Sequence, residues 1–470
     1  MKFDISDLNE GQKEAYDLLC NFINDKTGDE MFVLSGFAGT GKTYLVNKVI
    51  RYIRNTHPNY KIALTAPTNK AVKVLRRAAM RDKNHVRDSK VEFQTIHRLL
   101  GLTEEITKSG EQIFTRKDYS KNSVKYYKVL VVDEVSMLDD SLFNELELYS
   151  DNVKIIFMGD PAQIPPVGRP DCIPFRDDVS DKYKFIKYQL SKIERQGLDN
   201  PIVSLGFEIR SNLEAYDPIG NFRKTSFVEG SDHLGIDLIN TSLASERDRG
   251  MQLLHDMFCS DEFKRDADYA KVLAWRNKTI DKMNEILRTM IYGQDKHKIM
   301  VGEKLVANKP IMDELTNSIL FNTNDEFEVK SFTIDQMPCA TSHEAITVKF
   351  YNTLVQYETP DDEIDEIEIP ILHESSISAF NKAANFLKEI AISTKGKDRS
   401  WLKYYSFLRQ FADVNYNYAI TCHKAQGSTY KNVFVIEDDM DENRNIVERN
   451  RIKYTAVTRP SDKLFLMKRV

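Results

Sequence analysis

The eight residues from Gly36 to Thr43 have the types and the spacing that hold a nucleoside triphosphate. Their sequence, GFAGTGKT, fits the pattern GxxxxGK[ST]. In such a loop, glycines let backbone N–H groups point at phosphate oxygens, Lys42 reaches the β- and γ-phosphates, and the Thr43 hydroxyl can bind Mg²⁺. An apolar run at 31–35 precedes the loop, and helix-like apolar spacing at 44–50 follows it. This context predicts a strand, a phosphate loop and a helix.

Two carboxylates stand at the end of a second apolar run, residues 128–132. A continuous apolar run is typical of a buried parallel strand, and such strands deliver polar side chains to their C-terminal edge. Asp133 therefore suits Mg²⁺, and Glu134 suits a base that orients water. A third apolar run, 153–158, ends in GDPAQIPPV, where Gln163 is a candidate for sensing the γ-phosphate. Alone, this last segment predicts only a turn.

Length, charge and cysteine content limit the number of domains and the class of protein. At 470 residues the chain exceeds one ordinary core, since domains typically have roughly 100–200 residues, so we expect two to four domains. Neither a signal peptide nor a membrane-spanning apolar run is apparent, and a cytoplasmic protein is expected. Five scattered cysteines favour reduced thiols. The net charge is −5, but it becomes +1 without the six acids of 361–368, a run expected to form a solvated loop or edge.

Seven motifs occur in an order that resembles one enzyme family. They are GFAGTGKT, APTNKAV at 66–72, VVDEVSM at 131–137, GDPAQIPPV at 159–167, LSKIERQ at 190–196, HKAQGST at 423–429 and YTAVTR at 454–459. Together they resemble the superfamily 1 helicases, and most closely the RecD/Dda-like B subclass. The resemblance extends over positions 8 to 459, nearly the whole chain.

The resemblance implies roles for single residues. Gln12 matches the glutamine that reads adenine, although a plain helix N-terminus explains it almost as well. Arg195 and Arg459 match two arginine fingers that reach the γ-phosphate from a second core. Gly427 lies in a segment that touches both the DNA backbone and the nucleotide, and His423 is a hydrogen-bonding residue of the same motif rather than a metal ligand. The loop residues implied in ATP binding are Gly36, Ala38, Gly39, Thr40, Gly41, Lys42 and Thr43.

The expected fold class is α/β, with two RecA-like P-loop cores and ATP between them. Strand-like runs at 271–275, 432–436 and 463–467 and a helix at 277–291 support the second core. We expect the first core at 1–190. The second core is expected at 191–300 and 415–470, and an insertion at 301–414.

A hairpin is expected within 101–127, where strand-like residues 106–108 and 112–115 flank the turn Ser109-Gly110-Glu111. It resembles the pin that splits the duplex in this family. Phe114 stands where an aromatic ring can stack on the first base pair, although packing under its own hairpin explains it nearly as well.

The insertion begins with strand-like stretches at 304–306, 327–330 and 345–350, which suggest a small β-barrel similar to the family's SH3-like domain. Two amphipathic helical patterns follow and resemble the family's tower. One face carries Phe380, Ala383, Ala384, Leu387 and Ile390, and the other carries Trp401, Tyr404, Tyr405, Leu408 and Phe411. Trp401 and Tyr405 are interpreted as contacts that brace the pin.

The candidate track for a nucleic-acid strand consists of residues at strand ends of the first core, namely Pro67, Thr68, Asn69, Thr95, Ile96 and His97. Hydroxyl, amide and backbone N–H groups suit a grip that ignores base sequence. Four nearby cations could attract phosphates, although a solvated helix face is the commoner explanation: Lys73, Arg76, Arg77 and Arg81.

The resemblance implies an ATP- and Mg²⁺-dependent helicase that moves 5′→3′ on single-stranded DNA and opens forks, as a monomer. Phage replication, recombination or repair, with single-stranded DNA-binding proteins as partners, is suggested by likeness alone. A translocase that strips proteins from DNA and an RNA-directed relative remain alternatives. A small-molecule P-loop kinase or a switch GTPase would leave Arg195 and the last two motifs unexplained, and a non-enzymatic DNA-binding module would not need Asp133 and Glu134.

Overall fold

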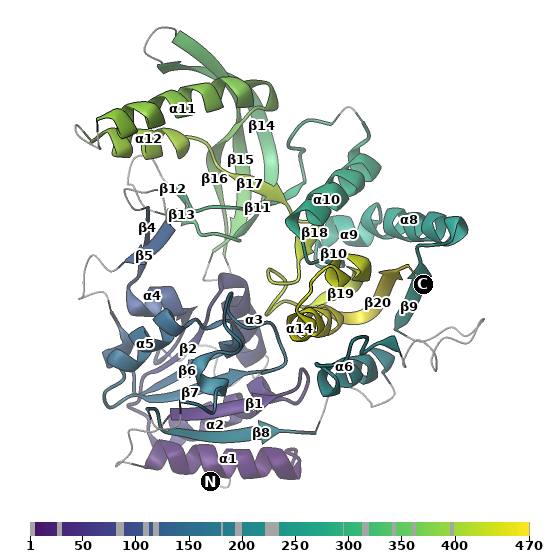
Figure 1. Ribbon diagram of the computed structural model, residues 1–470. Helices are drawn as coiled ribbons and strands as arrows, with labels where there is room; N and C mark the ends of the chain where they lie inside the picture. The colour runs from purple at the N-terminus through teal and green to yellow at the C-terminus, as the bar shows by residue number, and fades with distance from the viewer. Residues whose placement is uncertain are drawn as a thin grey trace.

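The computed structural model describes residues 5–25, 31–80, 89–106, 112–115, 122–179, 182–192, 200–220, 235–294, 296–312, 319–340, 345–359, 363–394 and 399–469. Two parallel sheets lie side by side, and a third, antiparallel sheet rises above them (Figure 1). Both parallel sheets have helices on their two faces, so the α/β class predicted from the sequence is confirmed.

The first core contains a six-stranded parallel sheet in the order β3-β2-β6-β7-β1-β8. Its four inner strands are short apolar runs with both faces buried, whereas the edge strands β3 and β8 are partly exposed. The strands are β1 (Met31–Gly36), β2 (Ile62–Ala66), β3 (Val91–Thr95), β6 (Val129–Val132), β7 (Lys154–Gly159) and β8 (Phe185–Leu190). The helices are α1 (Glu10–Asn24), α2 (Lys42–Thr56), α3 (Asn69–Met80), α4 (Ile96–Leu100) and α5 (Asp140–Leu148).

The second core contains a five-stranded sheet in the order β18-β10-β19-β20-β9. The predicted strands at 271–275, 432–436 and 463–467 are present within one to three residues of their expected ends, as is the helix at 277–291. The strands are β9 (Ile236–Asn240), β10 (Ala270–Ala274), β18 (Ala419–Thr421), β19 (Tyr430–Ile436) and β20 (Pro460–Lys468). The helices are α6 (Pro201–Ser211), α8 (Ala244–Phe258), α9 (Asp261–Arg265), α10 (Asn277–Tyr292), α13 (Glu437–Asp441) and α14 (Ile446–Val457).

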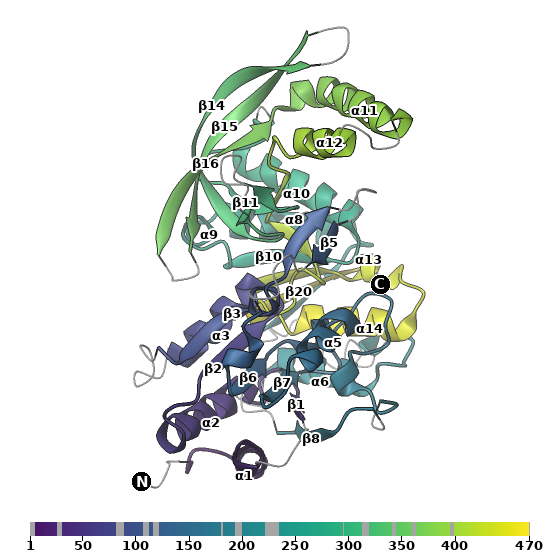
Figure 2. The same ribbon diagram turned by 90° about the vertical axis from the view of Figure 1, so that its left-hand side faces the viewer.

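A short hairpin rises from the first core after α4. Strands β4 (Thr103–Ile106) and β5 (Gln112–Thr115) are antiparallel, with Glu104 opposite Phe114. In both views the hairpin points towards the helices of the insertion (Figures 1 and 2). The turn at 107–111 and the side chain of Phe114 lie outside the described residues.

The insertion domain, residues 301–414 together with β17, is built on an antiparallel sheet in the order β16-β15-β14-β11-β17. Figure 2 shows the long strands β14 and β15 extending well above the cores. The acidic run enters the edge strand β16, where residues 364–366 are exposed, so the expected edge position is confirmed. The strands are β11 (Lys304–Ala307), β12 (Ile311–Met312), β13 (Ile319–Phe321), β14 (Glu326–Ala340), β15 (Ala345–Glu358), β16 (Ile364–Leu372) and β17 (Val414–Tyr416).

Two helices, α11 (Ile377–Ser393) and α12 (Ser400–Leu408), pack against this sheet where the two amphipathic patterns were predicted. Phe380, Ala383 and Ala384 are buried with Val348 and Phe407 in one apolar cluster. The Trp401 and Tyr405 rings stack 5.8 Å apart and remain partly exposed. Their contact with the hairpin stays a prediction.

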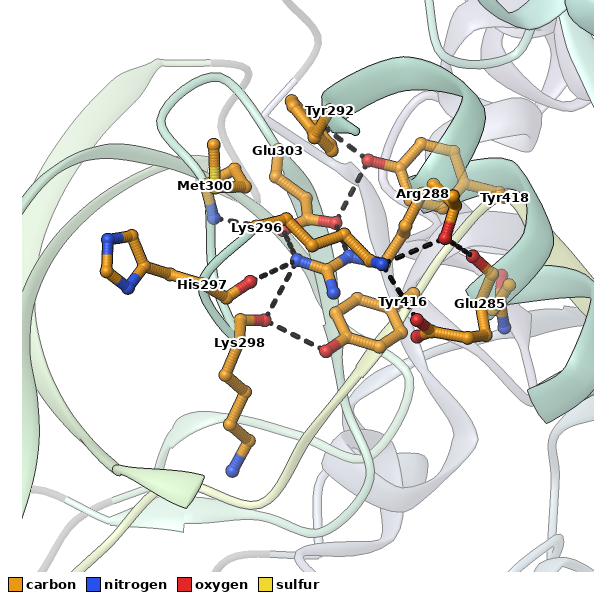
Figure 3. A network of polar contacts seen from close by, with 12 residues as sticks. Glu285, Arg288, Tyr292, Lys296, His297, Lys298, Met300, Glu303, Tyr416 and Tyr418 are labelled. Carbon is orange, nitrogen blue, oxygen red and sulfur yellow. Dashed lines mark hydrogen bonds and ion pairs between the residues drawn. The ribbon is translucent and has the colours of Figure 1, made fainter. Parts of the chain in front are cut away.

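A buried ion pair joins the insertion domain to the second core (Figure 3). Arg288 of α10 donates to the two carboxylate oxygens of Glu303 at 2.6 and 3.1 Å, and both residues are at most 2% exposed. The Tyr418 hydroxyl donates to the same carboxylate at 3.0 Å. The guanidinium also lies 4.0 Å from the centre of the Tyr416 ring. Arg288 Nε and Nη2 and both Glu303 oxygens thus have partners at the boundary between the second core and the insertion domain.

Candidate nucleotide site and strand track

The phosphate loop connects β1 to the N-terminus of α2, as predicted. Lys42 opens α2 and donates from Nζ to the carbonyl oxygens of Gly36 at 2.8 Å and Phe37 at 3.0 Å. Burial lowers the pKa of Lys42, and the carboxylates of Asp160, Asp133 and Glu134 oppose that shift. The ammonium group is therefore held over the loop among acids, where an arriving phosphate would compete with two carbonyl oxygens for it.

Gln12 lies against the back of the loop. Its Nε2 donates to the Thr40 carbonyl oxygen at 3.1 Å, and its Oε1 accepts from the Asn9 backbone N–H at 3.1 Å. A Cβ atom on Gly41, whose φ is +80°, would stand 2.6 Å from that Nε2. A larger residue at position 41 would strain the backbone and push the Gln12 amide away from the loop. The Gln12 amide still has one N–H and one oxygen lone pair to offer.

Asp133 and Glu134 lie at the C-terminal end of β6, as the sequence predicts. Glu134 has a left-handed backbone with φ of 51°, and its N–H donates to Asp133 Oδ1 at 2.9 Å. Burial, and then the neighbouring charge of Glu134, raises the pKa of Asp133 to about 7. The two carboxylates thus share one site where a cation would relieve their repulsion.

Gln163 follows β7 and lies at the same C-terminal edge of the sheet as Asp133 and Glu134. Its side chain is 6% exposed, and its Oε1 has no hydrogen-bond partner among the described residues. A buried amide oxygen without a partner is costly unless water or a ligand satisfies it. Gln163 is therefore placed to accept a hydrogen bond from a water molecule.

The second core reaches this edge through the motif at 423–429. Gln426 donates from Nε2 to the Ile164 carbonyl oxygen at 2.8 Å. Gly427 has a φ of +71°, and a Cβ atom there would lie 3.2 Å from Ala71 Cβ and 3.5 Å from Glu134 Cγ. The proposed base and the second core are thus in direct contact.

Arg459, one of the two predicted arginine fingers, makes its hydrogen bonds within the second core. Arg459 is 5% exposed, and its guanidinium donates to the Thr455 and Ser428 carbonyl oxygens and to the Thr458 hydroxyl, all in the second core. Arg195 lies outside the described residues. His423 is partly buried, and that burial lowers its pKa, so the imidazole is neutral at pH 7.

Sequence reasoning missed a different arginine. Arg210 of α6 pairs with Asp160 at 2.6 Å, and the Tyr454 hydroxyl donates to the other oxygen of the same carboxylate. The Arg210 guanidinium also lies 5.3 Å from the centre of the ring of Phe37, a phosphate-loop residue. Asp160 and Tyr454 belong to recognised motifs, but no motif marks Arg210.

The strand-track residues lie at one edge of the first sheet, because β2 and β3 are parallel neighbours with Ala66 opposite Thr95. The Thr95 hydroxyl accepts from the Arg98 N–H and caps α4, and the Thr68 hydroxyl accepts from the Ala71 N–H. Burial lowers the pKa of His97. The Ile96 side chain is fully buried, so a contact of Ile96 with a strand would have to use its backbone and stays a prediction.

The cations of α3 face protein carboxylates. Lys73 and Arg77 both pair with Glu358 at 3.1 Å, and Arg76 lies over the Phe93 ring. Asn69 at the start of α3 donates to Asp325 at 2.8 Å. These contacts tie the first core to the insertion domain. Arg81 lies outside the described residues, and Pro67 is partly buried.

Comparisons with known proteins agree with this geometry. Residues 21–169 match a family model described as an AAA domain, and residues 416–467 match one described as a UvrD-like helicase C-terminal domain. The chain is 27% identical to the ATP-dependent DNA helicase Dda of Enterobacteria phage T4 over 93% of both chains. It is 26% identical to the RecBCD subunit RecD of Buchnera aphidicola, over 93% of this chain and 70% of that protein.

Two further likenesses extend over the whole chain. An uncharacterized protein of Acanthamoeba polyphaga mimivirus is 27% identical over 98% of this chain and 99% of its own length. A solved structure of Pif1 from Bacteroides with ADP-AlF3 and single-stranded DNA has 16% identity and a TM-score of 0.46, over 98% of this chain and 92% of that one.

Two parallel α/β cores, a phosphate loop facing the contact between them and the two matching family models define a helicase with an ATP-hydrolysing motor. The two matching models and the likeness to Dda and RecD support a superfamily 1 helicase of the RecD/Dda-like B subclass. In the part of the chain that is described, none of the helices combines the length and the apolar character needed to cross a bilayer.

The contact between Gly427 and Glu134 yields a first prediction. Gly427→Ala is expected to lower kcat for ATP about 10- to 100-fold, because the added methyl group would lie 3.2 Å from Ala71 Cβ and push the second core away from the edge that carries Glu134. Gly168→Ala is the matched control, since Gly168 has a similar φ of +76° but open space around it. Both variants should lose roughly 1–2 kcal/mol of stability to backbone strain. Steady-state ATPase assays showing equal kcat values for the two variants would contradict the contact.

Proposed function

We propose that the chain is an ATP- and Mg²⁺-dependent helicase that moves 5′→3′ on single-stranded DNA and separates the strands of a fork. The observation that supports this proposal is that Gly427 lies beside Glu134, so the edge of one core that carries the two carboxylates meets a motif of the other. Similarity to the Dda helicase over 93% of both chains supports DNA as the substrate.

The nucleotide is proposed to bind with its phosphates on the loop from Gly36 to Thr43. Lys42 leaves its two carbonyl partners for the β- and γ-phosphates. The hydroxyl of Thr43 and the carboxylate of Asp133 are hard oxygen donors that suit Mg²⁺, which neutralises phosphate charge when bound. The free N–H and lone pair of Gln12 fit the N7 acceptor and N6 donor of adenine.

Hydrolysis is proposed to use residues from both cores. Glu134 takes a proton from the attacking water, and the unpartnered Oε1 of Gln163 accepts the water's other hydrogen bond. Arg195 and Arg459 are proposed to approach the γ-phosphate from the second core. Because Arg459 is now bonded within that core, this role requires its side chain to turn.

The strand is proposed to run over the edge formed by Pro67, Thr68, Asn69, Thr95 and His97, with His423 on the second core. Alternating grip by the two cores then converts ATP-driven opening and closing into steps. The chain is proposed to act as a monomer, in phage replication, recombination or repair, alongside single-stranded DNA-binding proteins. Viral relatives support that setting.

The ATPase rate without polymer, with single-stranded DNA and with RNA tests the substrate class. Single-stranded DNA should raise kcat at least tenfold, whereas RNA should have little effect. Stimulation by RNA alone would establish an RNA-directed enzyme, and stimulation by neither would overturn the motor. Forks with a single 5′ or a single 3′ tail test direction, and only the 5′-tailed fork should be opened.

Phe114→Ala separates unwinding from translocation. Since β5 places Phe114 on a hairpin that rises from the first core, we expect the variant to keep DNA-stimulated ATP hydrolysis within about twofold and to lose most unwinding of a 5′-tailed fork. Ile113→Ala on the same strand is the matched control. Equal loss of both activities would mean that Phe114 packs under its hairpin. Full unwinding by the variant would favour a translocase that mainly displaces bound proteins.

A further inference from the structure

Asp160 is a buried carboxylate that lies between the phosphate loop and the second core. It directly follows β7, whose last residue pairs with Ser35 of β1, so Asp160 stands level with the start of the loop. Its side chain is 1% exposed. The phosphate loop also contacts the second core. Phe37 of the loop is buried among side chains of that core, and the centres of the Phe37 and Tyr454 rings are 5.6 Å apart.

Two of the three partners of this carboxylate come from the second core. Arg210 of α6 donates to Oδ1 at 2.6 Å, and the Tyr454 hydroxyl of α14 donates to Oδ2. The third partner is the Ala162 backbone N–H in the same loop, at 3.0 Å. Arg210 supplies the positive charge in this set. When the cores separate, Asp160 therefore loses the charge of Arg210 and keeps one backbone donor, the Ala162 N–H.

The charge of Asp160 acts on the nucleotide site because it interacts electrostatically with Lys42 of the phosphate loop. Among the carboxylates near Lys42, Asp160 does most to raise the pKa of that lysine, while Arg210 acts in the opposite direction. A triphosphate on the loop brings several negative charges to the same place. An unneutralised, desolvated carboxylate there would repel the phosphates, as like charges do in any poorly solvated site.

We propose that Arg210 is a positioning residue that neutralises Asp160 only while the two cores are together, so that triphosphate affinity depends on core closure. This inference rests on the ATP-binding part of the proposed function. Coupling between two equilibria is reciprocal, so ATP in turn favours the closed arrangement. Through Arg210 the second core therefore changes the affinity for the triphosphate. This effect differs from that of an arginine that contacts the γ-phosphate directly.

A double-mutant cycle distinguishes this role from direct phosphate contact. The probes are a fluorescent, non-hydrolysable ATP analogue and fluorescent ADP, bound to the full chain without polymer. Arg210→Met should weaken the triphosphate about tenfold relative to ADP, because the buried charge of Asp160 is then uncompensated. Asp160→Asn in the Arg210→Met background should restore the ratio to within twofold of Asp160→Asn alone. A double variant as weak as Arg210→Met, or an unchanged ratio in Arg210→Met, would overturn the proposal.

Two controls keep the result independent of folding. Arg276→Met removes an arginine that pairs at 2.7 Å with another buried carboxylate, Asp439, away from the loop, and should leave the nucleotide ratio unchanged. Arg210→Lys keeps the charge and should stay within threefold of the unaltered chain. Since the assay contains no DNA, failure of DNA stimulation would count against the proposed function and leave this measurement standing. Failure of the unaltered chain to bind either nucleotide would count against both.

Discussion

Glu134→Gln is expected to lower ATP turnover about 10³-fold while nucleotide affinity stays within twofold, because the substitution removes a proton acceptor and little else. The Glu134 side chain is held by a left-handed backbone next to Asp133 and contacts the position of Gly427. Its carboxylate is therefore fixed where the two cores meet. Glutamine has nearly the same shape, so the contact with the second core survives the change.

Single-turnover hydrolysis and equilibrium binding of fluorescent ADP measure the two effects separately. Glu147→Gln, on the exposed face of α5, controls for the loss of one negative charge and should match the unaltered chain. Parallel losses of turnover and affinity would make Glu134 a binding group. Unchanged turnover would place the base elsewhere, and Gln163 would then be the residue to examine as the organiser of the water.

The parts of the site that follow from strand order could be read from the sequence. The loop from Gly36 to Thr43, the pair Asp133 and Glu134, and Gln163 each follow a short apolar run, and parallel strands bring their ends to one edge. The same rule places the ends of β2 and β3, where Ala66 lies opposite Thr95, at one edge of the sheet. Local patterns suffice here because each residue sits directly after its own strand.

Contacts between elements distant in the chain could not be read this way. Arg210 meets Asp160 only because α6 packs on α14 and both lie against the first core. Lys73 was interpreted as a solvated cation or a phosphate contact, yet it pairs with Glu358, 285 residues away. Arg459 matches a motif, but its guanidinium bonds within its own core. A motif identifies a residue, but it does not say which residue its side chain contacts.

In the insertion domain the sequence predicted strands but not their lengths. Three stretches of three to six residues were predicted, whereas β14 and β15 have 15 and 14 residues. Their upper halves carry polar and apolar residues without strict alternation, since helices α11 and α12 cover part of one face and solvent meets the rest. The alternation of polar and apolar residues weakens where one face of a strand is covered by a helix along only part of its length. A strand of this kind is therefore recognised only in part from its sequence.

Arg288→Met is expected to destabilise the junction of the second core and the insertion domain by about 3–5 kcal/mol, because it leaves the buried Glu303 carboxylate without its counter-charge. Adding Glu303→Gln should recover more than half of that loss, since the amide keeps the shape without the charge, and its one oxygen can accept from the Met300 N–H while its NH2 group donates to the Tyr418 hydroxyl. Arg249→Met removes a half-exposed pair with Asp237 and should cost less than about 1 kcal/mol.

The chain offers two natural reporters for this test. It contains two tryptophans, and Trp275 follows β10 in the second core whereas Trp401 lies on α12 of the insertion domain. Urea titrations in Trp275→Phe and Trp401→Phe backgrounds then follow each side of the joint separately. If the joint holds the insertion domain on the second core, both reporters should unfold together in the parent and separate in Arg288→Met, with Trp401 changing at lower urea. A double variant as unstable as Arg288→Met would mean that Arg288 acts through its packing on Tyr416 rather than through the charge of Glu303.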